Sequence, residues 1–321
     1  MPVESPFFYY SVALVWIIST ACTPIGTKYV SGSFDHISTT FMSYISRAIP
    51  FIVTYFILSS TSVIKPIDLF SPDNLMLSSM ELFRSITSIL AFILLPSSIA
   101  QSIYFTFPVM MLWFNHILIG IPVEINTIIS GLLGLVGVMV VSWAGGSGAS
   151  GGGFTTVYVV GIILALLAAV FQAYEVVYLK KKDLESRGGV PQVINIVPQM
   201  AGFFTFGAII ATVLYAVYIM TTPYHSAFRI NISSGIIPVV SIILALGLTS
   251  FLPTLTHFVS LQGINANLVA LLPYTIVAVT VLVEWMFEGV ELDWLKIGGI
   301  GLISAGGLMS LYGLGWSGRP T

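Results

Sequence analysis

Long apolar runs alternate with short polar, glycine-rich or proline-rich breaks along the whole chain. A helix that crosses roughly 30 Å of hydrocarbon needs about 20 predominantly apolar residues. The runs therefore predict an all-α integral membrane protein with ten transmembrane helices. The predicted spans are 8–29, 36–59, 76–94, 97–118, 123–143, 156–179, 191–220, 234–257, 264–287 and 294–314.

Two of the breaks describe the organisation of the chain. The stretch "LPSS" (95–98) predicts a tight turn between two antiparallel helices, and "GGSGASGGGF" has the composition of a flexible linker. We therefore expect an N-terminal five-helix unit at 1–144, a Gly/Ser linker at 145–155 and a C-terminal five-helix unit at 156–321. The first apolar run lacks a basic segment before it and is long for a signal peptide, so it is interpreted as a retained helix.

Composition agrees with lipid as the solvent and excludes several classes of function. Only 7% of residues are charged and 56% are hydrophobic, whereas soluble domains carry about 25% charged residues. A net charge of −2 argues against nucleic acid as a partner. Cys22 is the only cysteine and the four histidines are dispersed, so we expect no disulfide within the chain and no metal site. No catalytic or nucleotide-binding motif is present, which predicts no enzymatic activity and no cofactor.

Lysine and arginine in the short loops predict the orientation. The cluster Lys180, Lys181 and Lys182 follows the sixth span, and the other even-numbered loops fall on the same side of the membrane. Both termini are therefore predicted to be cytoplasmic. The protein is expected in a plasma or inner membrane rather than in a Golgi, endoplasmic reticulum or plastid membrane, as a monomer or a homodimer.

The two halves of the chain can be aligned with each other. Pro108 matches Pro273 at an offset of 165, and Lys28 matches Lys180 at an offset of 152. Because each half contains five helices, an odd number, the second half is predicted to be inverted relative to the first. Inverted repeats are typical of carriers that alternate around a central site.

Several stretches carry a resemblance to a known family. They are "LFRS" in the third span, "LPSSIAQSIYFTFPV" before the fourth, "GIILALLAAVFQAYEVVYLKK" in the sixth, "INANLVALLPYTIVAV" in the ninth and "FEGVELDWLKIGGIGLISAGG" leading into the tenth. With them, the chain resembles the drug/metabolite transporter superfamily, in particular its EamA-type ten-helix carriers. One departure is "GIPVE" (120–124), which has proline or isoleucine at the position where the family pattern places a glutamate.

The resemblance implies a secondary transporter that works by alternating access. We expect small polar organic metabolites as substrates, with amino acids or related compounds among the candidates. Facilitated, exchange-coupled and proton-coupled transport all stay open. Two alternatives are a nucleotide-sugar or sugar-phosphate antiporter of an organelle membrane, and a membrane scaffold subunit without transport activity. A central cavity would argue against the scaffold.

Polar and ionisable residues inside the spans are candidates for substrate binding, because they are costly in lipid. Arg47 lies in the middle of the second span, whereas Arg84 and His257 are expected near the cytoplasmic interface. Asparagine and glutamine must face protein or a water-filled cavity. The predicted substrate-binding residues are Arg47, Gln101, Tyr104, Asn265, Asn267 and Tyr274, with helix–helix hydrogen bonding as the alternative for the set on the fourth and ninth spans.

Three further residues are predicted to take part in gating or coupling. Pro108 and Pro273 are expected to kink their helices at equivalent levels in the two halves. Glu175 lies about 7.5 Å along the helix from Lys180, at 1.5 Å of rise per residue. It has no lysine three or four residues away, so its partner must come from another helix or from water. Its counterpart in the first span is Thr23. Glycines of the fifth and tenth spans, such as Gly131, Gly134, Gly137, Gly298, Gly301 and Gly307, are expected to pack these helices closely as scaffold.

Overall fold

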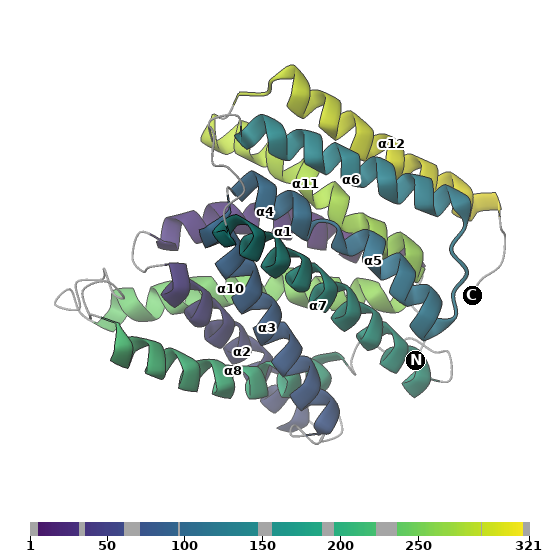
Figure 1. Cartoon of the computed structure of the whole chain (residues 1–321). Coiled ribbons are helices and arrows are strands. Elements are labelled where there is room, and N and C mark those ends of the chain that lie inside the picture. Colours follow the sequence, from purple (N-terminus) through teal and green to yellow (C-terminus); the bar gives the residue numbers. More distant parts are fainter. Residues whose placement is uncertain are drawn as a thin grey trace.

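A computed structural model of the chain describes residues 6–31, 36–60, 71–95, 97–146, 156–187, 196–222, 236–289 and 291–316, and these residues are almost entirely helical (Figure 1). The elements are α1 (Pro6–Ser31), α2 (His36–Ser60), α3 (Pro72–Leu94), α4 (Ser97–Tyr104), α5 (Phe107–Phe114), the π-helical segment η1 (Asn115–Ile119), α6 (Ile125–Gly146), α7 (Thr156–Arg187), α8 (Ile196–Thr221), α10 (Ile236–Gly263), α11 (Ala266–Glu288) and α12 (Trp294–Trp316).

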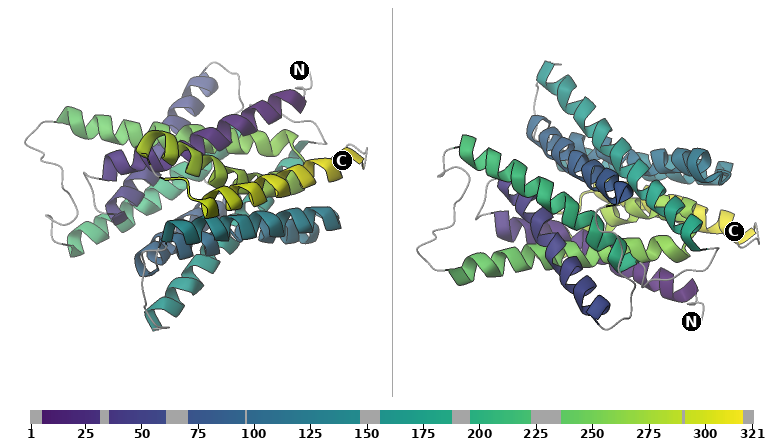
Figure 2. Two further views of the ribbon diagram at one scale, coloured as in Figure 1. Left: turned by 90° about the horizontal axis from the view of Figure 1, so that it is seen from above. Right: turned by 90° about the horizontal axis from the view of Figure 1, so that it is seen from below.

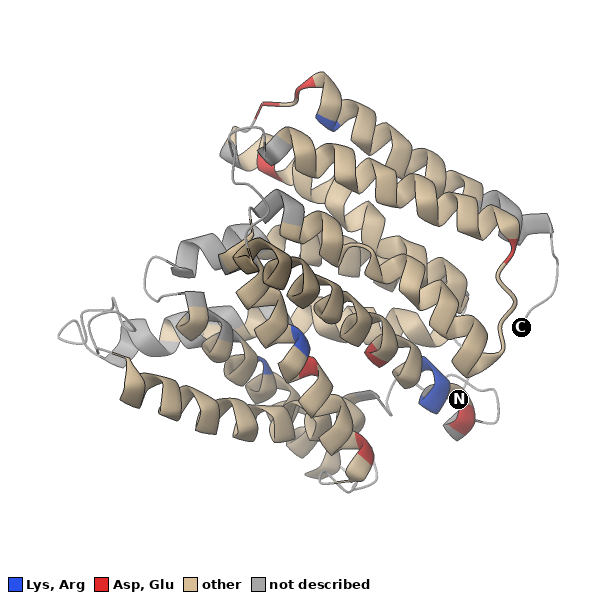
Figure 3. Ribbon diagram, viewed as in Figure 1, with Lys and Arg blue, Asp and Glu red and all other residues tan. Residues whose placement is uncertain are grey.

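The all-helical, membrane-embedded character predicted from the sequence is confirmed in outline. In the described part of the chain, five helices are long and apolar enough to cross a membrane, and shorter apolar segments lie in α1, α2 and α12. Figure 3 shows how few charged positions interrupt these helices. The predicted linker lies outside the described residues from position 147 onward.

Two helix boundaries differ from the prediction in ways that affect the site. The third span was expected to begin at 76, but α3 begins at Pro72, where the Ser71 hydroxyl caps the helix by accepting the Asn74 N–H at 3.3 Å. Proline at the first helical position needs no N–H partner, which makes this a favourable start. The eighth span was expected to end at 257, but α10 continues to Gly263. Both changes move residues that were expected near helix ends into helix interiors.

The fourth predicted span is not one continuous α-helix. It divides into α4 and α5 at Phe105 and Thr106, just before Pro108, whose nitrogen cannot donate a hydrogen bond. The Thr106 N–H instead bonds to the Ile103 carbonyl at 3.1 Å. In the other half, α11 continues through Pro273. The helix break is therefore present at one of the two matched prolines.

The helices pack with a regular pattern of partners. The pair α6 and α12 lies along one side of the bundle, with α11 beside it, whereas α2, α3 and α8 lie on the opposite side (Figures 1 and 2). In addition, α1 packs on α10 and α7 packs on α3. In the same way α2 packs on α10 and α8 packs on α3, while α11 contacts α12 and α4 contacts α6.

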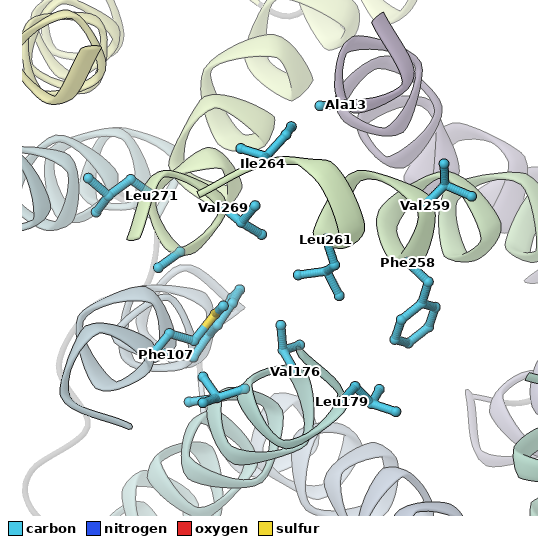
Figure 4. Close-up of a cluster of buried hydrophobic side chains, with 14 of the residues drawn as sticks. Ala13, Phe107, Val176, Leu179, Phe258, Val259, Leu261, Ile264, Val269 and Leu271 are labelled. Carbon is cyan, nitrogen blue, oxygen red and sulfur yellow. The ribbon is translucent and has the colours of Figure 1, made fainter. Parts of the chain in front are cut away.

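A shared apolar core joins these helices. Its largest fully buried side chains include Phe51 on α2 and Phe203 and Phe204 on α8. Figure 4 shows another part of this core, where Val176 and Leu179 on α7 point toward α10. Such burial supplies most of the packing contacts in the centre of the bundle.

Close packing between α6 and α12 depends on glycine. A Cβ added at Gly137 would lie 2.7 Å from the Gly299 carbonyl oxygen, and one at Gly306 would lie 2.7 Å from the Ser130 carbonyl oxygen. At Gly134 the added Cβ would meet the ring of Tyr274. The prediction of a close-packed glycine face holds for α6, but it was wrong for α12. There the close contacts use Gly299 and Gly306, whereas Gly298, Gly301 and Gly307 face open space because they lie on another side of the helix.

We expect Gly137→Ala to lower the free energy of unfolding by about 1–3 kcal/mol, because the nearest obstacle is backbone that must shift. Gly301→Ala is the matched control and should leave stability unchanged or slightly raised, since alanine favours helix over glycine. Unfolding by SDS in mixed micelles, followed by tryptophan fluorescence, measures both. Equal stability of the two variants would contradict the importance of this contact.

Candidate functional site

A cavity of about 270 Å³ lies inside the bundle. Its described lining comes from α1, α2, α3, α4, α5, α7, α8, α10, α11 and the α4–α5 turn, with no contribution from α6 or α12. The polar and charged lining residues are Thr20, Thr23, Arg47, Glu81, Arg84, Tyr104, Gln172, Glu175 and Thr254, and the ring-bearing ones are Trp16, Phe105, Phe107, Phe204, His257 and Phe258. The cavity thus combines charges with an aromatic wall.

Four charged side chains of opposite sign meet in this cavity. Both carboxylate oxygens of Glu81 accept hydrogen bonds from Arg84, one of them from Nε at 2.6 Å and the other from Nη2. Arg47 Nη1 lies 3.5 Å from Glu81 Oε1, and Glu175 Oε2 lies 3.9 Å from Arg84 Nε. The two arginines and two glutamates balance in formal charge. Balance is required here, because an unpaired ion away from water is very unfavourable.

A hydrogen-bonded chain extends from this cluster across the cavity. Arg84 Nη1 donates to the Tyr104 hydroxyl at 3.2 Å, and that hydroxyl donates to Gln172 Oε1 at 3.0 Å. The chain therefore connects α3, α4 and α7 through side chains alone. Tyr104 is the last residue of α4, next to the helix break. The position of the Tyr104 hydroxyl therefore depends on the geometry of that break.

Rings fix the outer parts of the cavity wall. The Arg47 guanidinium lies over the Phe204 ring, with 5.6 Å to the centroid, which is within the range of a cation–π contact. Trp16 of α1 stacks on His257 of α10, with centroids 4.1 Å apart and an interplanar angle of 13°. The Arg47 guanidinium therefore rests on an aromatic surface, and the stacked Trp16 and His257 rings join α1 to α10.

Only part of the predicted site lines the cavity. Arg47, Tyr104, Glu175 and Pro273 do so. The partner of Glu175 indeed comes from another helix, since Arg84 belongs to α3. Pro108 is buried beside Phe107 and is not among the described lining residues.

The asparagines make contacts between and within helices instead. Asn265 caps α11 by accepting the Asn267 N–H at 2.9 Å. The Asn267 side chain donates to the Pro122 carbonyl at 3.1 Å and accepts from Asn115 at 3.3 Å. These bonds satisfy the polar atoms without a ligand, so the alternative of helix–helix hydrogen bonding describes them better.

Gln101 and Tyr274 also lie outside the cavity lining. The backbone carbonyl of Gln101 accepts the Phe105 N–H at 2.9 Å, next to the break between α4 and α5. The ring of Tyr274 packs against Gly134 on α6. Both residues therefore make contacts within or between the helices around the cavity and do not line it.

Arg84 and His257, which were expected near the cytoplasmic interface, both line the cavity. Because α3 begins at Pro72, Arg84 occupies the middle of the helix, and because α10 continues to Gly263, His257 lies within its helix. Glu81 was missed in the sequence. Its signal was the spacing to Arg84, since residues three apart share a helix face and can pair.

The lysine cluster at the end of α7 has two kinds of environment. Lys182 pairs with the Asp73 carboxylate at 3.0 Å, and the Tyr178 hydroxyl donates to the same carboxylate. The hydrogen bond from Lys182 lowers the pKa of Asp73 below its usual value. Lys180, in contrast, is buried and donates to the carbonyls of Leu261, in the last turn of α10, and of Ile264, which follows that helix.

Comparisons with known proteins show the fold and nothing finer. No family model matches the chain, and no curated protein matches its sequence. A solved structure, a crystal structure of a protein, is similar at a TM-score of 0.75 with 18% sequence identity. The match covers 96% of this chain and 98% of the other.

Glu81→Gln tests the central ion pair. It removes one carboxylate charge from two guanidinium groups, so we expect the free energy of unfolding to fall by about 3–5 kcal/mol, the range for breaking a buried pair. Asp73→Asn, which removes an exposed pair, should cost less than about 1 kcal/mol. SDS unfolding in mixed micelles measures both, and similar small losses would show that the Glu81 pair is not a structural centre.

Proposed function

We propose that the protein is a secondary transporter that moves small polar organic metabolites across a membrane by alternating access. The observation that carries this proposal is the charge-balanced cavity whose charged and polar lining comes mainly from α1, α2, α3, α7 and α10 in a membrane-embedded bundle. A bundle that served only as a scaffold would gain nothing from four costly ionisable groups around an open space. A carrier needs such groups to replace the hydration of a polar substrate.

The helix contacts support an inverted repeat of two five-helix halves. Exchanging the halves pairs α1 with α7, α2 with α8, α3 with α10, α4 and α5 with α11, and α6 with α12. Under this exchange the contact of α1 with α10 becomes that of α7 with α3, and the contact of α4 with α6 becomes that of α11 with α12. Carriers with inverted repeats bind their substrate at the interface of the halves.

The offset of 152 residues supports the same symmetry at the level of side chains. It pairs Thr20 with Gln172 and Thr23 with Glu175, and all four residues line the cavity. The EamA-type resemblance of the sequence points to the same architecture. Within this proposal both termini are cytoplasmic, and the carrier works in a plasma or inner membrane.

Nucleotide sugars and sugar phosphates fit this cavity less well. Both cavity arginines already face glutamate, so the site has no surplus of positive charge for a phosphate. A cavity of about 270 Å³ also lies below the volume of about 300–1,000 Å³ that is usual for drug-sized ligands. A small metabolite fits these limits better. Glu175 is the residue that we assign to coupling, with either a proton or a counter-substrate.

Transport in proteoliposomes tests the proposal. Tyr104→Phe removes the hydroxyl that connects Arg84 to Gln172, and Arg47→Ala removes a charge from the cavity, so we expect both to reduce uptake at least about tenfold. Tyr10→Phe is the matched control on the exposed face of α1 and should transport normally. Unchanged uptake by Arg47→Ala and Tyr104→Phe would reject this cavity as the transport site.

A further inference from the structure

A second hollow, here called the apolar groove, lies between α2, α3 and α8 and has a volume of about 290 Å³. Figure 1 shows these three helices together on one side of the bundle. Helix α8 packs on both of the others, whereas α2 and α3 make few contacts with each other, so a space is left between them. The groove shares no described lining residue with the charged cavity. It is therefore a separate site.

The described lining of the apolar groove contains no charged side chain, and its surface is almost entirely hydrocarbon. Hydroxyl groups are present only on Tyr44, Ser85 and Tyr218 of this lining. A bound water needs two to four polar partners, and a polar metabolite needs polar groups placed to fix its orientation. The groove is instead suited to hydrocarbon, since an apolar cavity of about 150 Å³ is already large enough to bind benzene.

The groove opens toward the surroundings of the bundle. At its mouth Leu90 is 38% exposed, Leu214 is 39% exposed and Val217 is 54% exposed, whereas Tyr44 and Leu82 at its inner end are buried. In a membrane-embedded bundle these exposed side chains face lipid. An empty groove would leave its lining without partner atoms on one side, which forfeits dispersion energy. Lipid is therefore the neighbour that can enter it.

The length and direction of the groove match a lipid tail. From Leu82 to Leu90 the groove follows α3 for about 12 Å, at 1.5 Å of rise per residue. Its outer end lies near helix termini, since Ile37 is the second residue of α2 and Tyr218 lies in the last turn of α8. Its inner end, at Leu82, is in the middle of α3. The groove thus spans close to one leaflet, which is half of the roughly 30 Å hydrocarbon core.

We propose that the apolar groove binds a hydrocarbon tail of a membrane lipid, inserted from the membrane face at which α2 begins and α8 ends. Transmembrane helices tilt on average by about 20°, so a groove along α3 runs close to the direction of the lipid tails. The tail is the recognised part, because the described lining offers no charge to a headgroup. This site rests on the membrane-embedded bundle and does not depend on the proposed transport.

Tryptophan reporters in proteoliposomes test the insertion of the tail. Phosphatidylcholine with bromine atoms in the middle of its acyl chains quenches tryptophan on contact. Phe41→Trp places a reporter in the groove, and Phe83→Trp places one on the outer surface of α3, where Phe83 is 60% exposed and outside the groove lining. The signal of each reporter is its difference from the unmodified protein. We expect the brominated lipid to quench both reporters.

Filling the groove should protect only the reporter inside it. Ser85→Phe adds a ring from α3 and Val217→Phe adds one from α8, so each should reduce the quenching at position 41 at least about twofold and leave that at position 83 unchanged. Val213→Phe is the matched control, because Val213 is 59% exposed on α8 and lies outside the groove lining. Cooperative unfolding in SDS verifies that each variant is folded, and the two filling substitutions lie on different helices so that one can replace the other.

The headgroup provides an independent test. Phosphatidylglycerol with the same brominated chains should quench the reporter at position 41 as strongly as phosphatidylcholine does, since the described lining carries no charge. A strong dependence on the headgroup would overturn the tail as the recognised part. The inference is also overturned if the reporter at position 41 is not quenched in vesicles of brominated phosphatidylcholine, or if its quenching is the same in folded variants with a filled groove.

Discussion

The ion pair between Glu81 and Arg84 is the interaction on which the site depends. Both residues belong to one turn of α3, and their two hydrogen bonds satisfy Glu81 within a bundle that has few other charges. Charges held away from water are tolerated only when they are paired with good geometry. The pair then gives Arg47 from α2 and Glu175 from α7 opposite charges to face, so three helices meet through one cluster.

The helices that pack most closely through glycine are separate from those that line the cavity. The contact of α6 with α12 is fixed by glycines that bring backbone against backbone, and neither helix contributes to the described cavity lining. The cavity is instead enclosed by helices with larger side chains and by the break between α4 and α5. A carrier that alternates between two openings needs such a division, because the site must stay formed while the surrounding helices move.

One end of the bundle is held by contacts of the C-terminal part of α7 with α3 and α10. Lys182 of α7 pairs with Asp73 of α3, and Lys180 of α7 bonds to carbonyls at the end of α10 and just after it. Both contacts lie at the C-terminal part of α7, beyond Glu175. Helix α7 therefore joins the charged cluster to this end of the molecule.

The sequence by itself indicated that lipid surrounds the chain, that the chain is helical and roughly where its helices lie. The reason is that about 20 apolar residues in a row have few other stable arrangements. It also identified Arg47, Tyr104 and Glu175, since polar groups in such runs are costly. Only the tertiary structure decided which polar residues share a cavity. The Asn265 side chain accepts the backbone N–H of Asn267, and the Asn267 side chain donates to the Pro122 carbonyl. Arg84 lies in the middle of a helix that begins four residues earlier than predicted. Burial and pairing depend on which helices meet, and that information lies in the packing rather than in any single span.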